Sequence, residues 1–343
     1  MVRNLPYFVI TEGFFMYSRP EQLLEKYPLT LKAFSKGREC YLCDTSLGTY
    51  ALREYRGSKE RAAFLAEMLK HLKDTGLLVE EIVHTEAGEV LVTDEEERNF
   101  LLCEYYYGAE CDTKNEDDML AAVKMLASLH NATSTFDGEV PQLLQRNQNS
   151  LVTVCERHDR EMKQVKNYIR SKKKKNGFEM LFMNQCDSFM EKASKITTAL
   201  KNVECGQELY GFCHGDFNQH SIIFSKKGIA LVGLERFTYD LQIRDLANFV
   251  RKMMEKNNWN PELGKALLEA YDKVHPLREQ EKQYLYFFLA YPEKFWKLTN
   301  HYNNAHKSWL SERNVEKMEK VILQEEKREQ FLSLLFLSGI GYT

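Results

Sequence analysis

The hydrophobic period changes about a third of the way along the chain, and this change constrains the fold more than any other feature. Before the change, apolar and polar residues alternate, as they do in half-buried strands. Glu39–Thr45 and Tyr50–Tyr55 flank a turn at Ser46–Gly48 and predict a β-hairpin. After the change, apolar residues recur at helical spacing, as in Asp118–His130. We therefore expect an antiparallel sheet followed by a mostly helical region.

A single helix interrupts the strands of the first third. Apolar residues form one stripe along Ser58–Thr75, and Gly76 stands where a C-cap glycine is expected. Leu78–Thr85 and Glu89–Thr93 predict a second strand pair, and Asn99–Tyr106 predicts a further strand. The expected order is two strands, a helix and three strands.

The remainder of the chain predicts long helices around one short hairpin. The hairpin strands are Ser221–Ser225 and Ile229–Leu234. The length of 343 residues suits two domains, and the composition shifts near Gly108–Asp112. The sequence therefore predicts an N-terminal lobe over residues 1–108 and a C-terminal lobe over residues 109–343. The expected long helices are Ser150–Lys175, Glu179–Asn202, Asp245–Lys256, Pro261–Val274, Glu279–Tyr291 and Glu312–Leu337.

Charge and composition exclude several classes of protein. The 47 basic and 50 acidic residues give a net charge of −3, so a dedicated nucleic-acid-binding protein is not expected. The longest apolar stretch, Phe331–Tyr342, is shorter than the about 20 residues of a membrane-spanning helix. The N-terminus lacks the pattern of a signal peptide, so none is expected. Eight cysteines, including the pair Cys40 and Cys43, form no zinc pattern and predict free thiols.

A polar cluster, FCHGDFNQHSIIF at Phe212–Phe224, carries the chemical question. In a phosphotransferase such a cluster holds an Asp that accepts the proton of the substrate hydroxyl, and a side-chain amide five residues later binds magnesium. An Asp on the next strand then binds magnesium across the nucleotide phosphates. The alternative is a structural loop around a buried His214, and the HGD motif alone favours this interpretation. A second open question concerns the aromatic run Tyr284–Trp296, which suits either a substrate groove or the helical core.

The order of several segments along the chain favours the phosphotransferase interpretation over the structural loop. The segments are YALREY at Tyr50–Tyr55, EYYYGAECD at Glu104–Asp112, LASLH at Leu126–His130, CHGDFNQH at Cys213–His220 and RDLANFVRK at Arg244–Lys252. In this order they resemble the aminoglycoside phosphotransferase and choline kinase superfamily, and more narrowly the spore coat protein S (CotS) family. The resemblance implies a bilobal α+β, protein-kinase-like fold, with a small antiparallel sheet lobe and a larger, mainly helical lobe.

The resemblance also implies roles for individual residues. Asp216 stands at the position of the catalytic Asp, and His214 precedes it by two residues. Arg53 stands where a lysine pairs with the nucleotide phosphates, and Glu67 is its expected partner on the helix. The expected nucleotide is ATP. Two aromatic residues flank the expected adenine pocket: Tyr105 and Tyr107.

The two magnesium-binding positions depart from the pattern of the family. Ser221 replaces the amide and Gly233 replaces the carboxylate, while Glu235 offers a rescue ligand because alternate residues of a strand share a face. Removing one preorganised electrostatic group from an active site commonly costs about 2.7–4 kcal/mol of transition-state stabilisation. The sequence therefore predicts a pseudokinase, with magnesium binding not expected at the usual ligands.

The resemblance places the protein in the mother-cell cytoplasm and then in the spore coat, with other coat proteins as partners. The alternative is an active ATP-dependent phosphotransferase with Asp216 as base. Its substrate is a small hydroxyl compound, either a sugar or an aminoglycoside-like molecule. A third possibility is a protein that binds the nucleotide without a metal. Gly233 and Ser221 favour the first interpretation.

Overall fold

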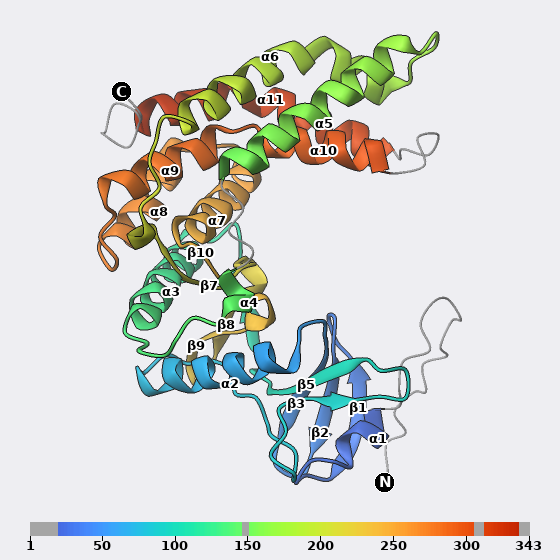
Figure 1. Ribbon diagram of the computed structural model, residues 1–343, viewed down its shortest axis with the longest axis vertical. Coiled ribbons are helices and arrows are strands. Elements are labelled where there is room, and N and C mark those ends of the chain that lie inside the picture. The colour runs from blue at the N-terminus through green and yellow to red at the C-terminus, as the bar shows by residue number, and fades with distance from the viewer. Residues whose placement is uncertain (1–19, 146–150, 305–311, 336–343) are drawn as a thin grey trace. The chain divides into compact units, whose positions relative to one another are not determined.

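The computed structural model describes residues 20–145, 151–304 and 312–335 (Figure 1). The chain divides into two compact units. The first comprises Met1–Ala63 and Glu81–Tyr105, and the second comprises Phe64–Glu80 and Tyr106–Thr343. Each unit thus contains two separate stretches of sequence. The lobe boundary between residues 108 and 109 stays a prediction.

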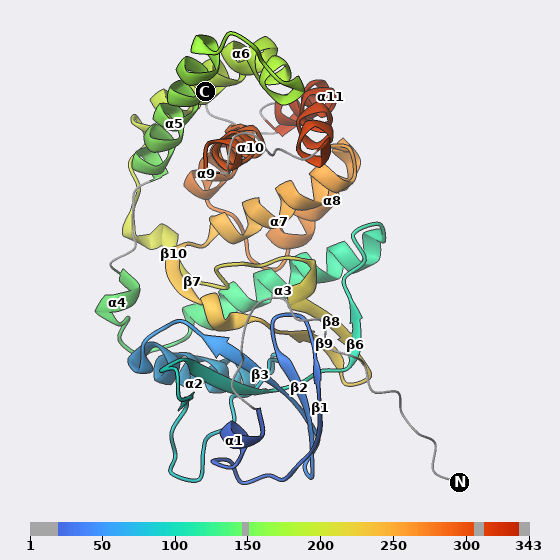
Figure 2. The same cartoon turned by 90° about the vertical axis from the view of Figure 1, so that its right-hand side faces the viewer.

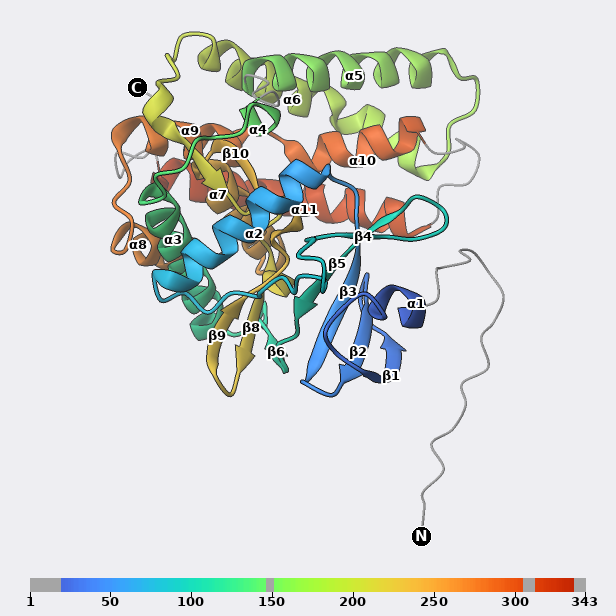
Figure 3. The same cartoon turned by 60° about the horizontal axis from the view of Figure 1, so that its bottom comes forward.

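The first unit is built around a five-stranded antiparallel sheet with the strand order β1-β2-β3-β5-β4 (Figure 3). The expected hairpin is confirmed, since β2 pairs with β3 from Tyr41 opposite Leu52 to Asp44 opposite Thr49. A short helix, α1, precedes the sheet. The elements are α1 (Pro20–Leu24), β1 (Leu31–Lys36), β2 (Tyr41–Thr45), β3 (Thr49–Tyr55), β4 (Val92–Thr93) and β5 (Asn99–Glu104).

The core of this unit forms between α1 and the sheet. Leu23 and Leu24 of α1 pack with Leu52, Phe100 and other apolar residues of the strands. Cys43 belongs to the same core, and burial raises the pKa of its thiol to about 12. A thiol held protonated in this way is a small apolar core residue, in agreement with the free thiols expected from the sequence.

The expected strand pair Leu78–Thr85 and Glu89–Thr93 is wrong. Only β4 forms in this region, and it pairs with β5. The segment before it crosses from the second unit to the first. Val79 makes a single bridge to Leu231 in the second unit, and Ile82 makes a single bridge to Cys103 in the first. The segment therefore makes two isolated bridges to different strands, and not the continuous strand pairing that its alternating pattern predicted.

The second unit contains two small sheets. One has the order β6-β8-β9 and includes the expected hairpin, while the other pairs β7 with β10 (Figure 2). The strands β6, β7 and β10 were not predicted, because three or four residues show no clear alternation. The strands are β6 (Gly108–Glu110), β7 (Tyr210–Cys213), β8 (Ile222–Ser225), β9 (Gly228–Leu231) and β10 (Thr238–Leu241).

Helices make up most of the second unit, as expected. α5 lies beside α6, α10 packs on α5, and α11 packs on α6 (Figures 1 and 2). α10 is an addition to the expected helices and begins directly after Pro292. α2 (Lys59–Asp74) continues from the first unit into the second. The other helices are α3 (Glu116–Ser134), α4 (Gln142–Gln145), α5 (Leu151–Ser171), α6 (Gly177–Leu200), α7 (Ile243–Lys256), α8 (Pro261–Asp272), α9 (Glu279–Ala290), α10 (Glu293–Asn304) and α11 (Glu312–Leu335), with short 3-10 turns η1 (Gln207–Leu209), η2 (Gln219–Ser221) and η3 (Leu234–Arg236).

None of the helices in the described ranges is both long enough and apolar enough to span a bilayer. Of the expected apolar stretch at the C-terminus, Phe331, Leu332 and Leu335 are buried, and residues 336–342 lie outside the described residues.

Candidate functional site

The HGD motif forms a tight loop between β7 and η2. Gly215 has a left-handed backbone with φ 83°. A Cβ at this position would lie 3.0 Å from the carbonyl carbon of Arg236 and closer still to its oxygen. Only glycine combines this conformation with this close backbone approach. Gly215 thereby fixes the path of the chain between His214 and Asp216.

The carboxylate of Asp245 holds this loop from α7. Its two oxygens accept the backbone N–H groups of His214 at 2.6 Å and Gly215 at 3.2 Å. Gln242 is the N-cap of α7, and Asp245 lies in the first turn of that helix. A carboxylate in the first turn is stabilised by the helix dipole. Asp245 thus holds the loop and the helix together.

His214 is buried, and each of its two ring nitrogens has a backbone partner, one outside the loop and one within it. Nε2 lies 3.0 Å from the carbonyl oxygen of Val232, and Nδ1 lies 3.4 Å from the backbone N–H of Asp216. A carbonyl oxygen only accepts hydrogen bonds, so Nε2 carries the proton and Nδ1 is the acceptor. His214 thus orients Asp216 through its backbone.

Asp216 is partly exposed, and each of its carboxylate oxygens faces a cation. Oδ2 lies 3.3 Å from Nη1 of Arg236, and Oδ1 lies 3.5 Å from Nζ of Lys252. Burial lowers the pKa of Lys252 and outweighs the opposite effect of Asp216. The Asp216 carboxylate has the geometry of an exposed base, but two cations share it.

Ser221 is buried at the end of η2 and its hydroxyl stays within the loop. Its Oγ accepts the backbone N–H of Asn218 at 3.3 Å. The Asn218 side chain in turn donates to the carbonyl oxygen of Asp216 at 2.7 Å and accepts the N–H of His220 at 2.9 Å. These polar groups shape the loop by binding one another.

Gly233 follows β9 in a left-handed conformation, with φ 81° and ψ 34°. Its backbone N–H and that of Leu234 donate to one carboxylate oxygen of Glu80, at 2.7 and 3.3 Å. Glu80 is only 2% exposed. A Cβ at Gly233 would meet no atom closer than Oε2 of Glu235, at 3.8 Å. The position therefore has space for a side chain that this sequence does not supply.

Sequence reasoning missed Glu80, because the segment around it was expected to be a regular strand. The sequence does contain a sign of this contact: Glu80 and Glu81 interrupt the otherwise apolar segment Leu77–Val83. A carboxylate that is buried with such a segment needs a fixed partner.

This donor set does not fit magnesium. Mg²⁺ takes oxygen ligands in a near-octahedral shell and is commonly bound through carboxylates. Gly233 offers no side chain, the Ser221 hydroxyl is held by the loop, and Asp216 faces two cations. Across the described residues, no group of three His, Cys, Asp or Glu side chains is placed to hold a metal ion.

The residues expected to contact the nucleotide are divided between the two units. Arg53 lies on β3 opposite Leu101 of β5, and Tyr105 directly follows β5 in the same unit. Glu67 and Tyr107 belong to the second unit and are exposed there. The roles of these four residues stay predictions.

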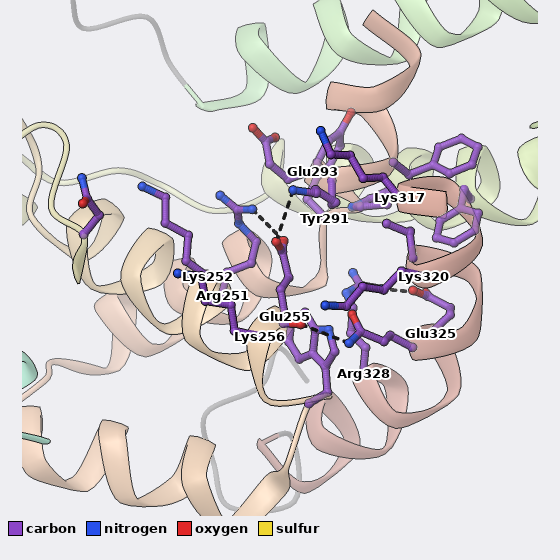
Figure 4. Close-up of a pocket in the computed structure, with 18 of the residues that line it drawn as sticks. Arg251, Lys252, Glu255, Lys256, Tyr291, Glu293, Lys317, Lys320, Glu325 and Arg328 are labelled. Atoms are coloured by element: carbon purple, nitrogen blue, oxygen red, sulfur yellow. Dashed lines mark hydrogen bonds and ion pairs between the residues drawn. The ribbon is translucent and has the colours of Figure 1, made fainter. Parts of the chain in front are cut away.

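The second unit also contains a cavity of about 510 Å³, and Asp216 is among the residues that line it. Figure 4 shows part of this lining. The walls of the cavity come from the HGD loop, α6, α7, α11 and the start of α10. Tyr291 and Phe295 line it, so part of the expected aromatic run does face a cavity. The cations around the cavity form no motif in the sequence, because they are spread over three helices.

Comparisons with known sequences match almost the whole chain. A family model described as "Spore coat putative kinase YutH" matches residues 20–335. Spore coat protein S of Bacillus subtilis (strain 168) is 26% identical over 330 residues, which cover 92% of this chain and 93% of that protein.

Solved structures share the fold. An aminoglycoside phosphotransferase from Alicyclobacillus acidocaldarius superposes with a TM-score of 0.81 at 17% identity, covering 95% of this chain and 98% of that one. A spectinomycin phosphotransferase superposes with a TM-score of 0.63 at 13% identity, covering 89% and 92%. The protein-kinase-like fold expected from the sequence is confirmed, with an antiparallel sheet in the N-terminal part and a mostly helical remainder.

Proposed function

This chain belongs to the YutH spore coat family, and we propose from this premise that it is a pseudokinase: a kinase-like coat protein that acts by binding rather than by magnesium-dependent phosphoryl transfer. The resemblance to spore coat protein S expected from the sequence is confirmed. The absence of catalysis is the part that we add.

Gly233 is the single observation that carries the proposal. It stands at the position where the family resemblance requires a magnesium-binding carboxylate. Its left-handed backbone is fixed by the buried Glu80, so the chain path is ordered while the ligand is missing. Kinase catalysis depends on metal ions that bridge the phosphates and neutralise the developing charge. Without this carboxylate, the reaction lacks its main means of charge neutralisation.

Ser221 and Arg53 add to the same conclusion. The Ser221 hydroxyl is a neutral, buried group that already accepts a hydrogen bond. Arg53 keeps a positive charge for the phosphates, but its planar guanidinium differs in shape and reach from an ammonium. Losing one preorganised contributor costs about 2.7–4 kcal/mol, which is roughly 100- to 1000-fold in rate.

One observation favours the active alternative. The Glu235 carboxylate lies 3.8 Å from the position of a Cβ at Gly233, so it borders the space of the missing ligand. In this alternative Glu235 holds a single metal and Asp216 acts as base on a small hydroxyl compound. The same catalytic assay decides between the two.

The remaining parts of the proposal rest on the family. ATP is the proposed nucleotide, held by Arg53, Tyr105 and Tyr107 without magnesium. One protein with the same fold, a spectinomycin phosphotransferase, has been solved in complex with ADP. We place the protein first in the mother-cell cytoplasm and then in the spore coat, with other coat proteins as partners.

The test is transfer of labelled γ-phosphate from ATP, to water and to added sugars and amino sugars, by the full-length protein with magnesium. We expect no turnover above that of the Asp216→Ala variant. The double variant Gly233→Asp with Ser221→Asn restores both ligand types, and Asp tolerates a left-handed backbone better than most residues. Gly233→Asn with Ser221→Asn is the matched control, because it has the same shape without the charge.

Turnover by the wild-type protein that Asp216→Ala abolishes would overturn the proposal and establish the active alternative. Turnover that appears in the Asp-containing double variant and not in its Asn-containing control would support it, because the missing carboxylate is then the cause of inactivity.

A further inference from the structure

The cavity beside Asp216 carries an excess of positive charge. Seven lysine and arginine side chains line it, against four aspartate and glutamate side chains. The cations come mainly from α7 on one side and α11 on the other (Figure 4). Because α7 and α11 are distant in sequence, their positive charges come together only in the folded protein.

The acidic residues of the lining are already neutralised. Glu255 pairs with Arg251 at 2.9 Å and with Lys294 at 3.6 Å. Glu325 pairs with Arg328 at 2.6 Å. Asp216 pairs with Lys252, as described above, and Glu293 pairs with Lys297 at 3.2 Å.

Three lysines of the lining are left over: Lys256, Lys317 and Lys320. Within the described parts of the chain, their ammonium groups make no ion pair or hydrogen bond. Burial lowers the pKa of Lys256 and outweighs the opposite effects of Cys111 and Glu255, so holding a positive charge there carries a cost. An anion in the cavity removes this cost.

The cationic walls are also held in place. Arg251 and Arg328 are at least nine-tenths buried, with exposed fractions of 6% and 7%. The Arg328 guanidinium lies over the Trp259 ring, 5.8 Å from its centre, and hydrogen-bonds to the carbonyl oxygens of Leu289 and Ala290. Such fixed cations need little reordering when an anion binds.

We propose that this cavity binds a small molecule with two or more phosphate or carboxylate groups, held by Lys256, Lys317 and Lys320. The volume of about 510 Å³ suits a small ligand. An amino sugar carries a positive charge and meets net repulsion here. The inference rests on the proposed function, since it names the ligand of a protein that acts by binding.

The test is calorimetric titration of the full-length protein with pyrophosphate and with citrate, both without magnesium. Glucosamine is the cationic control ligand. Lys317→Gln with Lys320→Gln removes two exposed cations of the cavity without touching its buried residues. Arg313→Gln with Lys327→Gln makes the same charge change on exposed positions of α11 outside the lining.

We expect at least one of the two anions to bind, and the cavity variant to weaken its binding at least tenfold. The α11 control variant changes binding less than twofold. The tighter of the two anions identifies phosphate or carboxylate as the preferred group. No binding of either anion at millimolar concentration, equal losses in the two variants, or equal binding of glucosamine would overturn the inference.

The two proposals fail separately. Anion binding together with phosphoryl transfer by the wild-type protein overturns the pseudokinase and keeps the anionic ligand. No anion binding and no transfer overturns the anionic ligand alone.

Discussion

The carboxylate of Glu80 accepts the backbone N–H of Gly233 at 2.7 Å, across 153 positions of sequence. This contact gives a glycine without a side chain a fixed, left-handed conformation at the position where a kinase needs a metal ligand. A buried carboxylate needs hydrogen bonds to compensate for its lost hydration, and the two adjacent N–H groups provide them. The loop thus keeps its shape without the metal.

Glu80→Ala should destabilise the second unit. It leaves the N–H groups of Gly233 and Leu234 without their acceptor, and an unsatisfied buried polar group costs about 1–3 kcal/mol. Urea unfolding of the full-length protein measures the loss. Glu86→Ala, which removes an exposed carboxylate a few residues later, is the control and should change the unfolding free energy by less than about 0.5 kcal/mol. Equal stability of the two variants would contradict the role of Glu80.

Asp245→Ala should cost more than Asp245→Asn. The alanine variant removes both acceptors of the HGD loop, whereas asparagine keeps one carbonyl oxygen for His214 or Gly215. Hydrogen bonds to a charged group contribute about 1.5–3 kcal/mol each. Thermal and urea unfolding of the two variants should rank them in this order below the wild-type protein. Equal losses, or a larger loss for Asp245→Asn, would contradict this role, because the loop would then not depend on the acceptor oxygens of residue 245.

The sequence predicted the long, periodic elements well and the junctions poorly. The β2–β3 hairpin and helices such as α3 each carry their own hydrophobic period. The segment Leu78–Thr85 alternates like a strand, but its residues bridge to two different units. Which strands this segment pairs with depends on residues far away in the sequence, so the segment itself contains no pattern that predicts the pairing.

The residues of the candidate site were also predictable only where they belong to a local sequence motif. Asp216, Gly233 and Ser221 were recognisable because they fall within motifs. Glu80 and the lysines of the cavity were not, because each is one charged residue among many in the sequence. Only the packing of distant segments brings Lys256 and Lys320 to one cavity.

Gly264→Ala should destabilise the contact between α8 and α11. A Cβ at Gly264 would lie 2.7 Å from Cζ of the buried Phe331 and 2.8 Å from Cε of Met254. Forcing an extra methyl group into a packed core costs about 1–3 kcal/mol. Gly177→Ala is the matched control at a helical glycine with no neighbouring atom within 4 Å, and it should be neutral or stabilising. Unfolding by urea separates the two.

The His275 side chain should make the protein less stable at acid pH. Burial, together with the nearby His130 and Arg278, lowers the pKa of His275 from 6.5 to about 4. Between about pH 6.5 and pH 4, His275 is therefore protonated in the unfolded chain but still neutral in the folded protein. This contribution to stability is complete above about pH 6.5 and is lost as the pH falls towards 4.

His275→Gln isolates this effect, because glutamine keeps a donor for Oδ1 of Asn131 without a titrating ring. The unfolding free energy of the wild-type protein should fall more steeply than that of the variant between pH 7 and pH 4. Parallel curves over this range would show that His275 titrates alike in both states.

Calorimetric titration of the wild-type protein with ATP, in the presence and absence of magnesium, shows whether this chain lacks a functional magnesium site. The structure offers Gly233 and a hydrogen-bonded Ser221 where magnesium ligands belong. We expect magnesium to leave the affinity for ATP unchanged. An affinity that tightens tenfold or more with magnesium would contradict this expectation, because other residues of this chain would then hold the metal.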